Sequence, residues 1–172
     1  RPSDSTLSRL HLMQANEPSQ SDYHIPGLLP EVLHSMGPAK GKVLVDGTLG
    51  GGGHTEALLK SGAQVIGIDQ DDQALAYARE RLAGYAGQFS GLKGNFSSMP
   101  QLLAEAGYEQ VDGILVDIGV SSWQLDEADR GFSFAKDGPL DMRMEQAGSS
   151  AADVVNTFGR SDLTRIIGIL GE

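Results

Sequence analysis

The stretch Val43-Leu44-Val45-Asp46-Gly47-Thr48-Leu49-Gly50-Gly51-Gly52-Gly53-His54 decides the fold. A short apolar run, typical of a buried strand, ends in a carboxylate and is followed by a loop almost without side chains. Glycine is costly in chain entropy and is used where φ is positive or where a ligand must approach the backbone closely. Residues 55–60 are predicted to form a helix, whose free N–H groups and positive dipole favour anionic groups. The stretch therefore predicts a ligand-binding loop between a strand and a helix.

A second apolar run, Val65-Ile66-Gly67-Ile68, ends in Asp69, about 20 residues beyond Gly50. An acidic residue at this position binds ribose hydroxyls in Rossmann-type units. The third glycine of a dinucleotide fingerprint is replaced by Thr55 or Glu56, and no Gly-Lys-Ser/Thr follows the loop. A nucleoside cofactor without pyrophosphate remains, and S-adenosylmethionine is the predicted one. The alternative is a glycine-rich turn that serves packing alone.

A third carboxylate follows the apolar run at residues 111–116, which we predict to be the fourth strand of the sheet. This carboxylate is Asp117. In open α/β sheets, ligands bind outside the carboxyl ends of the strands, where the winding direction reverses. Asp46, Asp69 and Asp117 are therefore expected on one edge beside the glycine loop. Each of them alone would be an ordinary turn aspartate.

The order of these motifs resembles the small-subunit ribosomal RNA methyltransferase H family. The matching segments are His24-Ile25-Pro26, Asp46-Gly47-Thr48, Gly50-Gly51-Gly52-Gly53-His54, Ile68-Asp69, Asp112-Gly113-Ile114-Leu115-Val116-Asp117, Gly119-Val120-Ser121-Ser122-Trp123-Gln124-Leu125-Asp126, Arg130-Gly131-Phe132-Ser133-Phe134 and Asp137-Gly138-Pro139-Leu140-Asp141-Met142-Arg143-Met144. Trp123 stands where the family usually has Pro, and Leu49 where it usually has Phe. The resemblance covers the N-terminal half of the family's length. It implies transfer of a methyl group from S-adenosylmethionine to the exocyclic N4 of a cytidine in 16S rRNA, with small-subunit rRNA or the ribosomal subunit as partner.

The resemblance also implies a set of cofactor-binding residues, namely Gly52, Gly53, His54, Asp69, Phe96, Asp117 and Gln124. Asp69 suits the ribose diol, and Gln124 offers both a donor and an acceptor to a polar edge of the cofactor. Phe96, placed at the end of a third strand over residues 89–96, is expected to contact the adenine ring. For Phe96 the alternative is a core aromatic. His54 is expected either to cap the helix or to donate to the methionine carboxylate.

Asp117 is also the first candidate for the catalytic residue, with Ser121 and Ser122 as secondary candidates. The sulfonium is already a strong methyl donor, so that the enzyme mainly aligns the reacting atoms. The lone pair of cytosine N4 is delocalised into the ring, and a carboxylate that accepts its N–H would localise that pair. The target base must leave its stack to reach such a pocket, and Trp123 is either a stacking face for it or a packing anchor.

Residues 130–144 allow two interpretations. Phe132, Phe134, Arg130, Lys136 and Arg143 interleave aromatic rings with cations, as RNA-binding surfaces do. The turn signal Asp-Gly-Pro at 137–139 and the methionines fit a structural lid over the cofactor equally well. The two roles are compatible.

Composition limits the remaining possibilities. The chain has 172 residues, enough for one domain with a sizeable core, and it has no cysteine. Its four histidines show no paired ligand spacing, so we predict no metal; no segment predicts a membrane span. We predict a cytoplasmic protein, or one of an organellar matrix or stroma. The net charge of −10 opposes an RNA partner. Two alternatives therefore stay open: a non-catalytic cofactor-binding fragment, and a methyltransferase acting on a different substrate.

Alternation of strands and helices predicts an α/β fold with a parallel sheet, and the resemblance implies a Rossmann-like class I methyltransferase. We expect a disordered leader (1–22), a cofactor-binding domain (23–145) and the start of a helical insertion (146–172). Strands are predicted at 43–45, up to 69, at 89–96 and up to 117. Helices are predicted at 30–36, 55–62, from a cap at Asp71 or Asp72 through Leu82 with Gly84 as the stop, at 100–107, 151–158 and 162–170.

Overall fold

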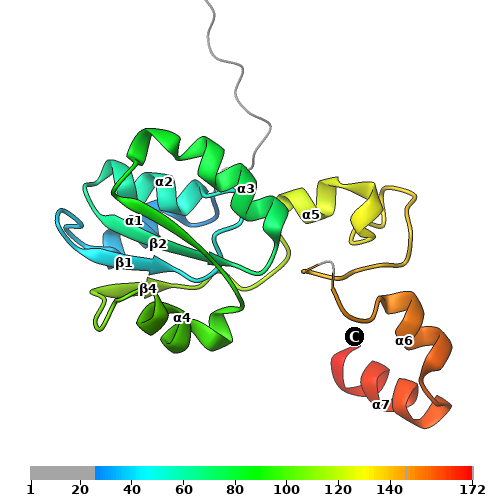
Figure 1. Cartoon of the computed structure of the whole chain (residues 1–172). Helices are drawn as coiled ribbons and strands as arrows, with labels where there is room; N and C mark the ends of the chain where they lie inside the picture. The colour runs from blue at the N-terminus through cyan, green and yellow to red at the C-terminus, as the bar shows by residue number, and fades with distance from the viewer. Residues whose placement is uncertain (1–25, 146, 172) are drawn as a thin grey trace, which may run out of the picture.

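The computed structural model describes residues 26–145 and 147–171, without the side chains of Ser122 and Trp123. Its centre is a parallel sheet in the order β3-β2-β1-β4 (Figure 1). The strands are β1 (Val43–Asp46), β2 (Gln64–Asp69), β3 (Phe89–Lys93) and β4 (Gly113–Leu115). Because β2 and β4 lie on opposite sides of β1, the winding direction reverses at the carboxyl end of β1. The predicted α/β class with a parallel sheet is confirmed.

Helices cover both faces of the sheet. One face carries α1 (Leu29–Met36), α2 (Gly53–Lys60) and α3 (Asp72–Arg81), and the other carries α4 (Met99–Glu105) (Figure 1). The core under the first three helices is built by Ala39, Leu44, Leu49, Leu58, Leu59, Ala63, Val65, Leu75, Ala78 and Leu82. The core under α4 is smaller and is built by Val45, Ile66, Ile68, Met99 and Leu103. Alternate residues of β1 and β2 thus point to opposite faces, as in any sheet buried on both sides.

The C-terminal part is helical, and its last two helices lie apart from the sheet (Figure 1). It contains α5 (Ser122–Asp126), η3 (Ala128–Arg130), α6 (Ala151–Thr157) and α7 (Arg160–Leu170). Ser150 begins α6 with a capping box, in which its hydroxyl accepts from Asp153 N–H and the Asp153 carboxylate accepts from Ser150 N–H. The helices predicted at 151–158 and 162–170 are found, the second with an earlier start. The predicted leader lies outside the described residues, and no described helix is long and apolar enough to cross a membrane.

Two strands end earlier than predicted. β3 ends at Lys93 and not at Phe96, because Gly94 adopts a φ of 158° and the Asn95 side chain accepts from Ser97 N–H at 2.9 Å. Phe96 therefore begins a 3-10 turn, η2 (Phe96–Ser98). β4 ends at Leu115 and not at Asp117, since the Asp117 N–H donates to the Thr48 hydroxyl at 2.7 Å instead of to a neighbouring strand.

The structure also decides which aspartate caps α3 and corrects the predicted end of that helix. Asp71, and not Asp72, caps α3 by accepting from Gln73 N–H at 3.0 Å. The predicted stop at Gly84 is wrong. α3 ends at Arg81, and Gly84 lies inside the short 3-10 turn η1 (Ala83–Tyr85). The helix α5 was not predicted, and α2 begins at Gly53, two residues before the predicted start.

Gly67, in the middle of β2, leaves the space in which Leu49 of the glycine loop packs against the sheet. A Cβ there would lie 2.6 Å from Cδ1 of Leu49, which is buried. We expect Gly67→Ala to lower the free energy of unfolding by about 1–3 kcal/mol, because the close-packed leucine must move. Urea denaturation measures this, with Gly84→Ala as control, since no atom lies within 4 Å of the Cβ it adds. Equal urea midpoints for Gly67→Ala and Gly84→Ala would contradict the close packing of Leu49 against Gly67.

Candidate functional site

A cavity of about 390 Å³ opens at the carboxyl ends of the strands, beside the glycine loop. Of the predicted cofactor-binding residues, it is lined by Gly53, His54, Asp69, Phe96, Asp117 and Gln124. Gly27, Gln70 and Asn95, which the sequence did not single out, also line it, as do Ser121 and Met144 from the matching motifs. The cavity lies beyond the carboxyl ends of the neighbouring strands β1 and β4, where the winding direction reverses, and this is the expected position for a ligand in this topology.

Asp69 lies at the tip of β2 and holds two backbone segments. One carboxylate oxygen accepts from Gly50 N–H at 2.8 Å, and the other accepts from Asp71 N–H at 2.9 Å. Burial raises the pKa of Asp69, and these two backbone hydrogen bonds oppose the shift. A carboxylate has about four acceptor positions, so Asp69 keeps capacity for two ligand hydroxyls. This arrangement suits a ribose diol.

The glycines of the loop serve different purposes. Gly50 and Gly52 adopt φ values of 50° and 76°, which favour glycine. A Cβ on Gly52 would lie 3.2 Å from Leu82 of the α3 end, and one on Gly53 would lie 2.5 Å from Pro26. Close packing within the protein therefore accounts for part of the glycine content. Gly52 faces α3 and does not line the cavity, and its contact with a cofactor stays a prediction.

Arg81 and His54 hold the glycine loop from its two sides. Arg81 donates to the Gly51 carbonyl at 3.2 Å and to the Glu56 carboxylate at 2.7 Å. His54 Nε2 lies 2.9 Å from the Gly27 carbonyl; because a carbonyl only accepts, Nε2 carries the proton. His54 thus ties the first turn of α2 to the segment before α1, and it is not the helix cap.

Asp46 lies beneath the loop and not on the cavity wall. Its side chain is 1% exposed and accepts from the Thr55 hydroxyl at 2.7 Å and from Thr48 N–H at 3.2 Å. Burial raises the pKa of Asp46 above its ordinary value. Of the three strand-end carboxylates expected together, Asp69 and Asp117 line the cavity, whereas Asp46 fixes the loop from below.

Asp117 and Gln124 come from the segment after β4. The Asp117 carboxylate is exposed and has no hydrogen-bond partner among the described residues, so it is free to accept from a ligand. Gln124 is buried, and its Oε1 accepts from Ser121 N–H at 2.9 Å. The Gln124 side-chain amide therefore keeps its N–H groups for the cavity. Phe96 is 37% exposed and lies on the cavity wall, which argues against its being a core aromatic.

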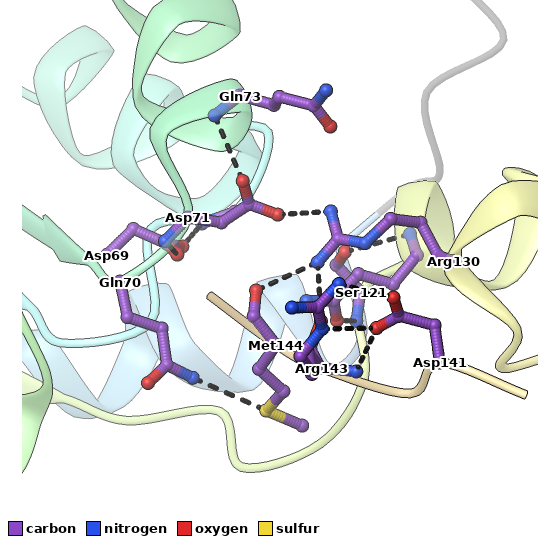
Figure 2. A network of polar contacts seen from close by, with 11 residues as sticks. Asp69, Gln70, Asp71, Gln73, Ser121, Arg130, Asp141, Arg143 and Met144 are labelled. Atoms are coloured by element: carbon purple, nitrogen blue, oxygen red, sulfur yellow. Dashed lines mark hydrogen bonds and ion pairs between the residues drawn. The ribbon is translucent and has the colours of Figure 1, made fainter. Parts of the chain in front are cut away.

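The cations of residues 130–144 are paired within the described part of the chain. Arg130 binds Asp71, Arg143 binds Asp141 at 2.7 Å, and Lys136 lies 3.6 Å from the Asp126 carboxylate. Arg143 lowers the pKa of Asp141 to about 2. Figure 2 shows the contacts of Arg130 and Arg143, with Asp71 close to Asp69. They favour the structural lid of the two interpretations, because the charges expected to meet RNA are occupied. The described residues contain no cluster of His, Asp and Glu side chains that could hold a metal.

A parallel sheet with a glycine loop after β1 and a carboxylate at the tip of β2 defines a Rossmann-like α/β protein. The chain belongs to the MraW methylase family, whose model matches residues 21–172. It is 56% identical over 154 residues to the ribosomal RNA small subunit methyltransferase H of Deinococcus deserti, covering 90% of this chain and 50% of that protein. It is 53% identical over 149 residues to the protein of the same name from Chelativorans sp., and the match covers 87% of this chain and 43% of that protein.

The chain spans about half the length of the curated relatives it matches. Among solved structures, it is similar to a SAM dependent methyltransferase from Aquifex aeolicus, with a TM-score of 0.39 and 18% identity over 83% of this chain and 78% of that one. A SAM-dependent O-methyltransferase from Thermotoga maritima matches with a TM-score of 0.43 and 14% identity, and the match covers 65% of this chain and 40% of that one.

The buried Asp46 predicts a pH-dependent stability. Because its pKa is raised in the folded state, the folded protein holds the proton more tightly than the unfolded chain. Stability therefore falls as the pH rises from the ordinary carboxyl pKa through the raised one. We expect Asp46→Asn, which keeps an acceptor for Thr48 N–H, to lose less stability than the wild type as the pH rises above about 4.

Urea denaturation at several pH values measures this effect. Asp46→Ala is the control. It removes both hydrogen bonds and should cost about 1–3 kcal/mol near pH 4, and because it also lacks the carboxyl it should show the same reduced pH slope as Asp46→Asn. An unchanged pH slope in Asp46→Asn would contradict a raised pKa at this position.

Proposed function

We propose that this chain binds S-adenosylmethionine and is the cofactor-binding part of a methyltransferase that acts on small-subunit rRNA. The observation that carries the proposal is Asp69, which is fixed by two backbone amides at the mouth of the cavity and keeps free acceptor capacity. Family membership supports the reaction class. The names of the relatives support the substrate, since they are small-subunit rRNA methyltransferases.

The lining residues fit the parts of this cofactor. Asp69 offers acceptors to the ribose hydroxyls, and the exposed face of Phe96 offers an apolar wall to the adenine ring. The bare backbone of Gly50, Gly51 and Gly53 allows close approach at the N-terminus of α2, where a carboxylate is favoured. The Asp117 carboxylate, which is unpaired among the described residues, suits a cofactor that carries a positive sulfonium. When bound, the cofactor supplies the activated methyl group.

The proposed acceptor is the exocyclic N4 of a cytidine. Its lone pair is delocalised into the ring, so a group that accepts its N–H would increase its nucleophilicity. Asp117 is the best-placed candidate, because its carboxylate is exposed at the cavity and its backbone is anchored to Thr48. The methyl transfer itself needs alignment more than covalent help from the protein.

The strongest objection is electrostatic. The chain carries a net charge of −10, and the cations of residues 130–144 are paired with carboxylates. A methyltransferase for a small molecule or a protein, or a cofactor-binding fragment without turnover, would meet no such difficulty. The proposed substrate locates the reaction where the small ribosomal subunit is assembled, in the cytoplasm or in an organellar matrix or stroma.

The cofactor site is tested by titration calorimetry with S-adenosylhomocysteine. We expect Asp69→Ala to weaken binding about tenfold to a hundredfold, because hydrogen bonds to a charged acceptor are lost. Asp72→Ala is the matched control. Asp72 lies three residues further along the chain, and its side chain is 72% exposed in an ion pair with Lys93. Equal affinities of the wild type, Asp69→Ala and Asp72→Ala for S-adenosylhomocysteine would contradict the role of Asp69 in the cofactor site.

The role of Asp117 is tested with Asp117→Asn, which keeps the backbone hydrogen bond to Thr48. We expect methylation of small-subunit rRNA by the variant to fall about a hundredfold or more, because an amide oxygen accepts a hydrogen bond from the N4 N–H but, unlike the carboxylate, cannot take up the proton. S-adenosylhomocysteine binding should change much less. Wild-type binding without turnover on any rRNA substrate would favour the non-catalytic alternative. Turnover on a small molecule or a protein would favour the different substrate.

A further inference from the structure

Arg130 is a buried arginine that joins two distant parts of the chain. It is 6% exposed, and its Nη1 lies 2.5 Å from the Asp71 carboxylate at the start of α3. Its Nη2 donates to the carbonyls of Arg143 and Met144 at 2.9 and 2.8 Å (Figure 2). Arg130 therefore connects the helix that follows Asp69 to the end of the segment 128–144, which we call the strap.

This pairing is poorly explained by stability alone. A buried ion pair loses hydration and is often matched in stability by apolar residues of similar volume. Arg130 also carries a cost, because its buried Nε–H has no hydrogen-bond partner among the described residues. An apolar residue at position 130 would not hold the carbonyls of Arg143 and Met144 at a fixed position relative to Asp71. The pairing is therefore better explained by placement of the strap.

The strap is packed tightly enough to be positioned as one unit. A Cβ on Gly131 would lie 2.2 Å from the Pro139 carbonyl oxygen, and one on Gly138 would lie 2.1 Å from the Ala128 carbonyl oxygen. The strap thus has two arms, residues 128–131 and 138–142, whose backbones are in direct contact. Met142 N–H also donates to the Arg130 carbonyl at 3.0 Å. Fixing Arg130 consequently fixes both arms.

The end of the strap forms part of the cavity wall. Met144 lines the cavity, and its sulfur accepts from Gln70 Nε2 at 3.4 Å. Gln70 follows Asp69 directly and accepts from Asn95 Nδ2 at 2.9 Å. In Figure 2 the Met144 side chain runs from its carbonyl, which Arg130 holds, to its sulfur beside Gln70. A polarizable thioether thus lies beside the ribose-type carboxylate, where it can contact a flat ring.

We propose that Arg130 is a positioning residue of the cofactor site, which holds the strap so that Met144 closes the cavity beside Asp69 over the nucleoside. The inference rests on the proposed function, because the nucleoside belongs to the proposed cofactor. Arg130 does not line the cavity, and it acts through Met144 and Gln70. Loss of a closing wall mainly speeds departure of a ligand, so the dissociation rate is the informative quantity.

The test measures dissociation of S-adenosylhomocysteine from the full chain by stopped flow. We expect Arg130→Met to raise the dissociation rate about tenfold while the association rate changes little. Met144→Ala should raise it similarly. Lys93→Met is the matched control, since it removes the exposed ion pair with Asp72, the neighbour of Asp71, and should leave the rate unchanged. Arg130→Lys should give fast dissociation as well, because one ammonium group does not reproduce the planar fork.

A second variant separates positioning from folding. In Asp71→Asn/Arg130→Met no buried charge is left unpaired, and asparagine still caps α3. We expect this protein to unfold at nearly the wild-type urea concentration and yet to release the ligand quickly. Hydrogen exchange of the amides of Met142 and Arg143 should be faster than in the wild type, even without ligand.

The possible failures are distinguishable. Wild-type dissociation rates in a folded Arg130→Met would overturn the positioning role and leave the proposed function intact. A change in Arg130→Met but none in Met144→Ala would overturn the closing contact of Met144. No binding of S-adenosylhomocysteine by the wild type would overturn the proposed function and this inference with it.

Discussion

The Asp69 carboxylate, which accepts from Gly50 N–H and Asp71 N–H, is the interaction on which the site depends. One side chain at the tip of β2 thereby fixes both the glycine loop after β1 and the entry into α3. The glycine loop has too few side chains to fix itself. Among the described residues the carboxylate is held by amides and pairs with no cation, so it faces the ligand without a competing counter-ion.

The same type of contact recurs around the cavity, where side chains bind backbone groups of a neighbouring loop. Thr48 accepts from Asp117 N–H and so joins the loop after β1 to the segment after β4. Asp71 both caps α3 and receives Arg130 from the strap. Side-chain hydrogen bonds to backbone set the relative position of loops that the sheet alone leaves free. A rigid sheet thus carries a site made almost entirely of loops.

The sequence predicted the features that follow from local pattern and missed those that depend on distant partners. Apolar runs ending in carboxylates located β1, β2 and β4, and residue type located the cap at Asp71. Phe96 was misplaced in a strand, because a glycine at an unusual φ ends β3 before it. The partner of Arg130 lies 59 residues away, so nothing local distinguished this arginine from an RNA-facing one. The burial of Asp46 likewise depends on how the loop folds over it.

The charge of the cavity constrains how a substrate can reach it. Asp69, Asp71 and Asp117 line the cavity, and Asp46 lies beneath the glycine loop next to it, so the local field favours a cationic sulfonium and disfavours phosphate. Of the cations near its rim, Arg130 and Arg143 are already bound to carboxylates. An RNA backbone would therefore be repelled from the cavity itself. A single neutral base turned out of its stack can still enter while its phosphates stay outside. The acidity of the site is thus compatible with an RNA substrate only if recognition of the base and of the backbone take place on different surfaces.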